Sequence, residues 1–158
     1  MQSVIERVSA LATDAETVWA WVTTPAGVND ELGPWIRMTV PAGWVQTSIA
    51  DIEPGTHLGK SWLLFLGVVP FDCDDMTIAE IDGRRFLERS RLLSASFWQH
   101  EREVVSTEAG SIVRDTVTFE SRQVLRWVPG GCRIHAAILG AIFSGRHRRL
   151  LARFGRAE

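Results

Sequence analysis

The sequence predicts an α+β fold in which a curved antiparallel sheet is covered by one long C-terminal helix. Two observations support this prediction. About six strand-like segments follow one another through the middle of the chain with short turns between them, which is typical of an antiparallel meander. After residue 130 the apolar side chains recur with a helical period instead. A meander must bury one of its faces, so we expect the final helix to cover it.

We expect a first strand over Ser3–Leu11, followed by two short helices. The segment Thr13-Asp14-Ala15-Glu16 has the pattern of a capping box, in which Thr13 caps the first helix and Glu16 reciprocates. A proline disfavours helical backbone in the residue before it, so Pro25 should end this helix at Thr24.

The second helix should cover Ala26–Leu32, and the chain then becomes strand-like. The strands expected in this region are separated by turns that contain proline or glycine, and they cover Trp35–Val40, Val45–Ile52, Leu58–Leu66, Cys73–Ile81 and Arg84–Leu92. Asp82-Gly83 is a two-residue hairpin signal between the last two of these strands.

This hairpin divides its charged residues between two faces. Glu80 would lie opposite Arg85 and Asp74 opposite Arg91, which suits an outer surface of paired charges. Glu88 falls on the alternate face, where it would be internal.

A further hairpin between Trp98 and Glu120 carries ionisable groups on an apolar face. If residues 108–111 form its turn, Thr107 lies opposite Ile112. The apolar face then holds Trp98, Val104, Val113, Val117 and Phe119, with His100, Arg102 and Asp115 among them. A buried charge is costly unless it is paired or hydrogen-bonded. Either these three groups satisfy one another, with Arg102 a diagonal neighbour of Asp115, or they line a cavity and meet a ligand or water.

The last helix is expected over Arg133–Phe154, with Leu139, Phe143, Leu150 and Phe154 on one stripe. Arg146 falls near the centre of this stripe, so it would either project toward the three ionisable groups or reach the cavity rim. Two inward arginines would face one aspartate unless Glu88 also points inward. Surplus positive charge would favour a ligand with an anionic head.

The composition restricts the class of protein. A length of 158 residues suits a single domain over 1–158, and a net charge of −2 argues against nucleic acid as a partner. Cys73 and Cys132 form no paired motif, so neither a disulfide nor a metal site is expected, and no cofactor is implied. The most apolar run, Leu63–Val69, is too short for stable membrane insertion. With no secretory signal in the first residues, we expect a cytoplasmic monomer or homodimer.

The order of elements resembles that of the START-like superfamily, also called SRPBCC or birch-pollen-allergen-like, which includes polyketide cyclases/dehydratases and lipid carriers. Local motifs resemble a bacterial branch of it, and they are Phe86–Ser90, Trp98–Arg102, Asp115–Glu120 and Arg146–Leu150. The resemblance implies a helix-grip fold: six to seven strands wrapped around the last helix, two short helices after the first strand, and an apolar cavity beneath the last helix. It implies no particular reaction.

Three functions are therefore considered. The first is binding or carriage of a small hydrophobic or amphipathic molecule, lipid- or polyketide-like, by Trp98, His100, Arg102, Val104, Asp115, Val117, Phe119, Phe143, Arg146, Leu150 and Glu88. The second is a cyclase/dehydratase in which Asp115 orients His100 as the general acid and base. The third is a protein-interaction module, which would expose an apolar patch.

Overall fold

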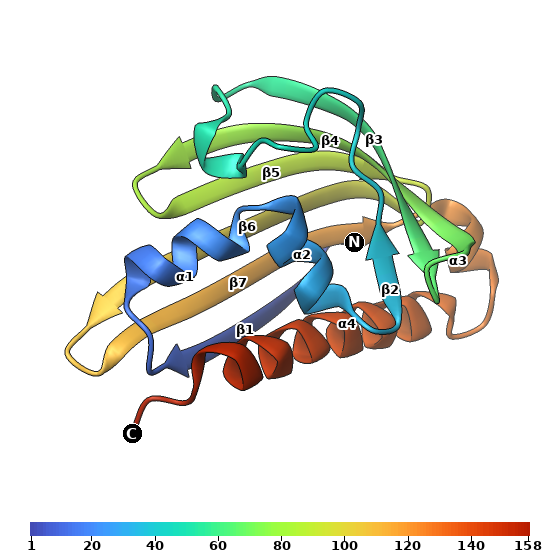
Figure 1. Ribbon diagram of the computed structural model, residues 1–158. Coiled ribbons are helices and arrows are strands. Elements are labelled where there is room, and N and C mark those ends of the chain that lie inside the picture. The colour runs from blue at the N-terminus through green and yellow to red at the C-terminus, as the bar shows by residue number, and fades with distance from the viewer.

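A seven-stranded antiparallel sheet curls around the long C-terminal helix (Figure 1). The computed structural model describes all residues from 1 to 158. The strands are β1 Ser3–Leu11, β2 Ile36–Met38, β3 Thr56–Phe65, β4 Val69–Asp82, β5 Arg85–Leu92, β6 Ala95–Thr107 and β7 Gly110–Ser121. The helices are α1 Ala15–Val22, α2 Pro25–Leu32, the short 3-10 helix η1 Ile49–Asp51, α3 Gln123–Trp127 and α4 Gly131–Phe154. The predicted α+β helix-grip architecture is confirmed.

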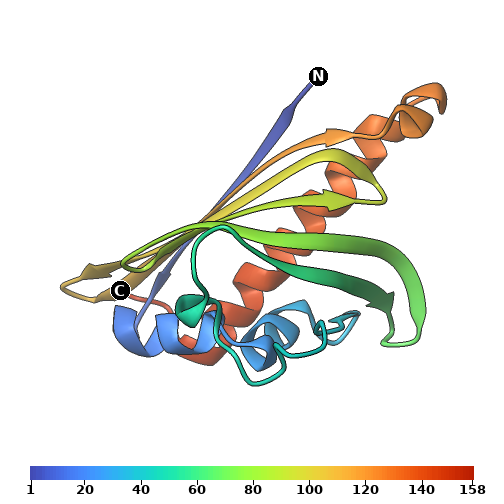
Figure 2. The ribbon, with the colours of Figure 1, turned by 90° about the horizontal axis from the view of Figure 1, so that it is seen from above.

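The strand order is β1-β7-β6-β5-β4-β3-β2, so the first strand closes one edge of the sheet beside the last strand. Helices α1, α2 and α4 lie on the concave side of this sheet (Figure 2). One apolar cluster packs under α1 and the C-terminal half of α4, and it includes Leu11, Val18, Val104, Val113 and Leu150. A second packs under the middle of α4 and includes Trp98, Val117, Phe119, Leu139 and Phe143.

The strand predicted over Val45–Ile52 is wrong. This segment is a loop that ends in η1, and its polar groups bond to the end of α1 instead of a neighbouring strand. The Ile49 amide donates to the Thr23 carbonyl at 2.8 Å, and Ser48 Oγ donates to Thr23 Oγ1 at 2.8 Å. Hydrogen bonds from a serine side chain can replace the backbone pairing of a β-sheet, so the alternating pattern did not produce a strand here.

The predicted cap of the first helix is also wrong. Asp14 is the N-cap, and its carboxylate accepts the Thr17 amide at 2.9 Å. Thr13 Oγ1 instead donates to the Phe154 carbonyl at the end of α4, at 2.9 Å. Aspartate and threonine cap comparably well, so a distant contact decides between adjacent candidates. The second helix begins one residue earlier than predicted, with Pro25 in its favoured first position.

The β6–β7 turn is shorter than predicted. Only residues 108 and 109 lie outside the strands, and Thr107 pairs with Gly110. The register therefore differs by two residues from the expected one. Side chains alternate with a period of two, so a two-residue difference leaves each one on its predicted face. It also places Arg102 directly opposite Asp115 and not diagonal to it.

A register shift in the β4–β5 pair overturns the predicted position of Asp74. The shift falls between Ile78 and Glu80, and beyond it Asp74 pairs with Leu92 while Asp75 pairs with Arg91. Such a bulge exchanges the faces of the residues that lie beyond it from the hairpin turn. Asp74 is therefore buried on the concave side and does not pair with Arg91 on the outer surface.

Two hairpin glycines provide a test of the fold. Gly110 has a φ of +137°, and a Cβ there would lie 2.2 Å from the Leu11 carbonyl oxygen, whereas a Cβ at Gly83 meets nothing within 4 Å. We expect Gly110→Ala to reduce the free energy of unfolding by at least about 3 kcal/mol. The control Gly83→Ala should cost only about 1 kcal/mol, from its positive φ. Urea unfolding of both variants measures the difference, and equal losses would contradict the close β1–β7 approach.

Candidate functional site

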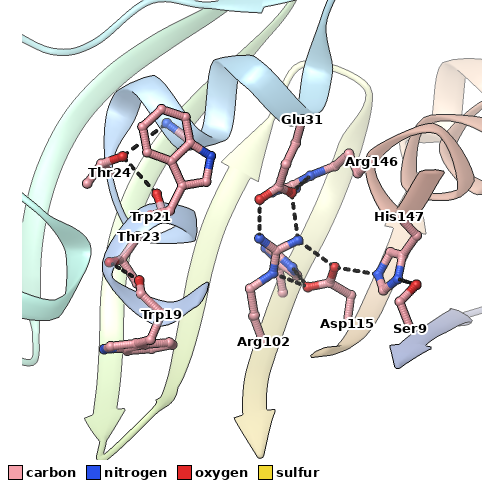
Figure 3. A network of polar contacts seen from close by, with 12 residues as sticks. Ser9, Trp19, Trp21, Thr23, Thr24, Glu31, Arg102, Asp115, Arg146 and His147 are labelled. Atoms are coloured by element: carbon pink, nitrogen blue, oxygen red, sulfur yellow. Dashed lines mark hydrogen bonds and ion pairs between the residues drawn. The ribbon is translucent and has the colours of Figure 1, made fainter. Parts of the chain in front are cut away.

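Arg102 lies at the centre of a network of buried charged side chains (Figure 3). Its Nε and Nη2 donate to Asp115 Oδ1 and Oδ2 at 2.7 and 2.6 Å. Its Nη1 and Nη2 donate to Glu31 Oε1 and Oε2 at 2.7 and 2.8 Å. The planar guanidinium thus binds two carboxylates in bidentate fashion, one from β7 and one from α2.

Helix α4 extends this network from the other side (Figure 3). Arg146 Nε donates to Glu31 Oε2 at 2.9 Å. His147 Nε2 hydrogen-bonds with Asp115 Oδ2 at 2.8 Å, and its Nδ1 hydrogen-bonds with Ser9 Oγ on β1 at 2.8 Å. The network therefore joins three strands of the sheet to two helices.

His100 continues the network along the sheet toward β5. Its Nε2 hydrogen-bonds with Asp115 Oδ1 at 2.8 Å, and its Nδ1 lies 3.7 Å from Glu88 Oε2. Glu88 Oε1 also accepts hydrogen bonds from Ser90 Oγ at 2.7 Å and from Trp98 Nε1 at 3.1 Å. Both ring nitrogens of His100 thus face carboxylates, which leaves neither nitrogen directed at open space.

The pKa values follow from this pairing. Burial raises the pKa of Asp115, but the charge and hydrogen bonds of Arg102 outweigh burial and hold that pKa well below its ordinary value. Burial lowers the pKa of His100, but hydrogen bonds to Asp115 and Glu88 outweigh it, so the net shift is upward. Burial raises the pKa of Glu88, but the hydrogen bond and charge of His100 act in the opposite direction, and the net shift is downward.

Charge in this interior is balanced. The guanidinium groups of Arg102 and Arg146 and the imidazole of His100, whose pKa is raised, face the carboxylates of Glu31, Asp115 and Glu88. Glu88 points inward, as the alternation predicted. With Glu31 supplying a further carboxylate, the surplus of positive charge that would favour an anionic ligand is absent.

Every residue predicted to line a site is buried on the concave side: Glu88, Trp98, His100, Arg102, Val104, Asp115, Val117, Phe119, Phe143, Arg146 and Leu150. Their polar members satisfy one another, which is the first of the two alternatives that the sequence left open. Their contact with a ligand stays a prediction.

Sequence reasoning missed Glu31 and His147. A signal existed for His147, because it continues the apolar stripe four residues after Phe143 and three before Leu150. Glu31 carried no such signal. It lies in a short helix among polar neighbours, 71 residues from the arginine it binds.

An apolar cavity of about 60 Å³ lies beneath α2 and the segment that joins β2 to β3. Its lining includes Trp44, Ile49, Ile52, Leu58, Ser61 and Met76, and none of the predicted ligand-binding residues. No cluster of three or more His, Cys, Asp or Glu side chains has an arrangement suited to a metal ion.

Two buried polar atoms near this cavity have no hydrogen-bond partner, and they are Ser61 Oγ and Asp74 Oδ1. Ser61 lines the cavity and pairs with Asp74 in the β3–β4 register. Burial and the adjacent Glu88 carboxylate raise the pKa of Asp74 well above its ordinary value, which favours its protonated form. An unpartnered buried polar atom costs about 1–3 kcal/mol, so this pair marks a place where a ligand or water would bond. A third such atom, Trp21 Nε1, belongs to α1 and does not line the cavity.

Comparison with solved structures confirms the START-like fold. Protein CV1439 from Chromobacterium violaceum superposes with a TM-score of 0.68 at 15% identity, covering 96% of this chain and 97% of that one. A START superfamily protein from Mycobacterium smegmatis gives 0.65 at 11% identity, covering 96% of each chain. The Zhui aromatase/cyclase from Streptomyces sp. R1128 gives 0.66 at 12% identity, covering 97% and 93%. At these identities the likeness establishes the fold alone.

The chain belongs to the family described as Domain of unknown function (DUF8410), whose sequence profile matches residues 9–154. Among curated proteins, none matches the sequence.

Removing the central guanidinium should destabilise the protein. Arg102→Leu leaves the Glu31 and Asp115 carboxylates facing each other without a cation, and we expect a loss of about 3–5 kcal/mol. The matched control is Arg85→Leu, which breaks half-exposed ion pairs to Glu80 and Glu101 on the outer face and should cost at most about 1 kcal/mol. Chemical denaturation measures both, and a small loss at Arg102 would contradict the network's central role.

The raised pKa of His100 should make stability fall on the alkaline side of its ordinary value of 6.5. In that range the unfolded chain releases the proton while the folded chain keeps it, so stability decreases with pH until the folded pKa is passed. The variant His100→Gln should lack this decrease. Unfolding free energies from pH 5 to 9 test this, and identical pH profiles for the two proteins would contradict it.

Proposed function

We propose that this chain binds and carries a small, largely apolar molecule on the concave side of its sheet, with a neutral hydrogen-bond donor of the ligand held by Ser61 and Asp74. One observation carries the proposal. Ser61 Oγ, a buried atom without a hydrogen-bond partner, lines an apolar cavity, and Asp74 Oδ1, which also has no partner, belongs to the residue that pairs with Ser61 in the β3–β4 register. Natural interiors seldom leave such atoms unsatisfied, so a group from outside the chain is the fitting partner.

The cavity indicates the size and character of the ligand. Its volume of about 60 Å³ holds a compact group, whereas sites for drug-sized molecules reach about 300 Å³ or more. A ligand as large as a benzene ring, which occupies a cavity of about 150 Å³, would enter only if the segment over residues 39–55 moved outward, and this applies to the three probes named below. That segment forms no ladder with the sheet over most of its length, and Ser48 and Ile49 tie it to Thr23. Loops of this kind are common lids over binding sites.

The charges near Ser61 indicate the polar group. Asp74 Oδ1 has no partner and can accept a hydrogen bond, and Ser61 Oγ can both donate and accept. An anionic head would be repelled by Glu88. This favours a hydroxyl over the carboxylate considered from sequence, and hydroxylated lipid- or polyketide-like molecules fit that chemistry.

Binding is preferred over catalysis because of how His100 and Asp115 are held. His100 has a carboxylate at each nitrogen, and Asp115 is bonded by Arg102 and His147 as well. A general base needs a nitrogen within reach of substrate. In this proposal the network positions Glu88, and through it Asp74, behind the ligand. The START superfamily and aromatase/cyclase proteins of the same fold support ligand binding as a class and do not name this ligand.

Three probes of similar size test the proposal: phenol, toluene and benzoate, each titrated by calorimetry at pH 7. Phenol should bind, toluene should bind about tenfold more weakly for want of the hydroxyl, and benzoate should not bind. Ser61→Ala and Asp74→Val should each weaken phenol binding about tenfold and leave toluene unchanged. Asp74→Asn, which keeps the neutral acceptor, is the matched control and should retain phenol binding.

Failure would be informative in two ways. If no probe binds, the cavity is not a ligand site of this kind. If all three bind alike, or if Ser61→Ala retains full phenol affinity, the cavity binds molecules without using the two unpartnered atoms.

A further inference from the structure

An apolar surface remains exposed on α3 and the first turns of α4. Trp127 is 77% exposed, and Val124, Val128, Ile134 and Ile138 are each more than half exposed. We call these five residues the α3–α4 patch. Contiguous exposed apolar groups of this kind mark interaction sites on soluble folds.

Helix α4 has two apolar faces in its first half. One face holds the buried residues His135, Leu139 and Phe143. The other holds the exposed residues Ile134, Ala137, Ile138 and Ala141, at the spacing i, i+3, i+4 and i+7 that defines one helical stripe. The second stripe has no partner within the chain, so its pattern is explained only by something outside it.

The segment that forms the patch carries only positive charge. From residue 121 to residue 157 the sequence contains no aspartate or glutamate. Arg126 and Arg133 are exposed and form no ion pair. Glu120, at the end of β7, is bonded to the Met1 amino group at 2.6 Å. The patch is therefore apolar and basic, which suits an anionic partner.

The patch shares one end of the molecule with a second group of exposed apolar residues. Figures 1 and 2 both place α3 and the β3–β4 turn at the end away from the C terminus. At that turn Phe65, Leu66, Val68 and Val69 are exposed by 46%, 54%, 74% and 54%. Exposed apolar residues therefore lie in two separate segments at this end of the molecule.

We propose that the α3–α4 patch docks this protein on a membrane surface that contains anionic lipid. Exposed tryptophan with aliphatic neighbours and flanking arginines is the composition that partitions into the headgroup region. No helix of the protein has the length and apolarity to cross a bilayer, so the contact is peripheral. A second copy fits less well, because an isologous dimer would bring two basic patches together, each carrying the exposed Arg126 and Arg133. The proposal does not depend on the ligand proposed above.

The test is co-sedimentation of the full chain with vesicles of phosphatidylcholine, alone or with phosphatidylglycerol added. The protein should sediment with the anionic vesicles, less so in high salt, and remain free with phosphatidylcholine alone. Trp127→Ala should reduce partitioning about tenfold, and Trp62→Ala, an exposed tryptophan of the outer sheet face, should leave it unchanged.

Two double variants that remove the same charge from different surfaces test the role of the arginines. The double variant Arg126→Gln with Arg133→Gln should lose selectivity for anionic vesicles, whereas Arg89→Gln with Arg114→Gln, on the outer face, should keep it. All four arginines are exposed, so the variants should fold, as melting curves would check. Equal binding to both vesicle types, full binding by Trp127→Ala, or dimerisation in the ultracentrifuge that Trp127→Ala abolishes would each overturn the proposal.

Discussion

The fold depends on the need to bond a guanidinium that has no access to water. Arg102 is fully buried, and an unpaired charge in that position would cost several kcal/mol. Asp115, directly opposite Arg102 in the β6–β7 pair, accepts hydrogen bonds on one side of the guanidinium, and Glu31 of α2 accepts them on the other. Because Glu31 also binds Arg146, the same constraint fixes where α2 and α4 lie on the sheet.

This arrangement divides the concave side into two regions with different properties. Under α4, between the apolar clusters, lies the network of paired charges, and such networks are rigid because each member holds its neighbours. The region beneath α2 and the β2–β3 segment is apolar, contains a cavity, and leaves Ser61 and Asp74 incompletely bonded. Glu88 connects the two regions, since it contacts His100 on one side and raises the pKa of Asp74 on the other. In the proposed function, the charged network would form a rigid wall beside the cavity.

The spacing of apolar and polar residues predicted most helices and strands, because that spacing follows directly from the backbone geometry of each element. Strand alternation gave the correct inward faces of β6 and β7, even with the turn wrong by two residues, since only an odd shift changes faces. It failed where a tertiary bond or an irregularity intervened. Ser48 bonds to Thr23 and not to a strand, and the register shift after Ile78 turns Asp74 inward. Neither the hydrogen bond of Ser48 nor the register shift changes the alternation of apolar and polar residues in the sequence.

The sequence by itself determined that a meander with a C-terminal helix forms, and that His100, Arg102, Asp115, Arg146 and Glu88 face its interior. Which side chains these groups contact was decided by the tertiary structure alone. Glu31 lies 71 residues from Arg102, and His147 lies 32 residues from Asp115. Periodicity reports which way a side chain points, because neighbouring residues share one backbone geometry. The partner of a buried charge depends on how distant elements pack, and that packing sets whether an inward charge binds another side chain or is left for a ligand.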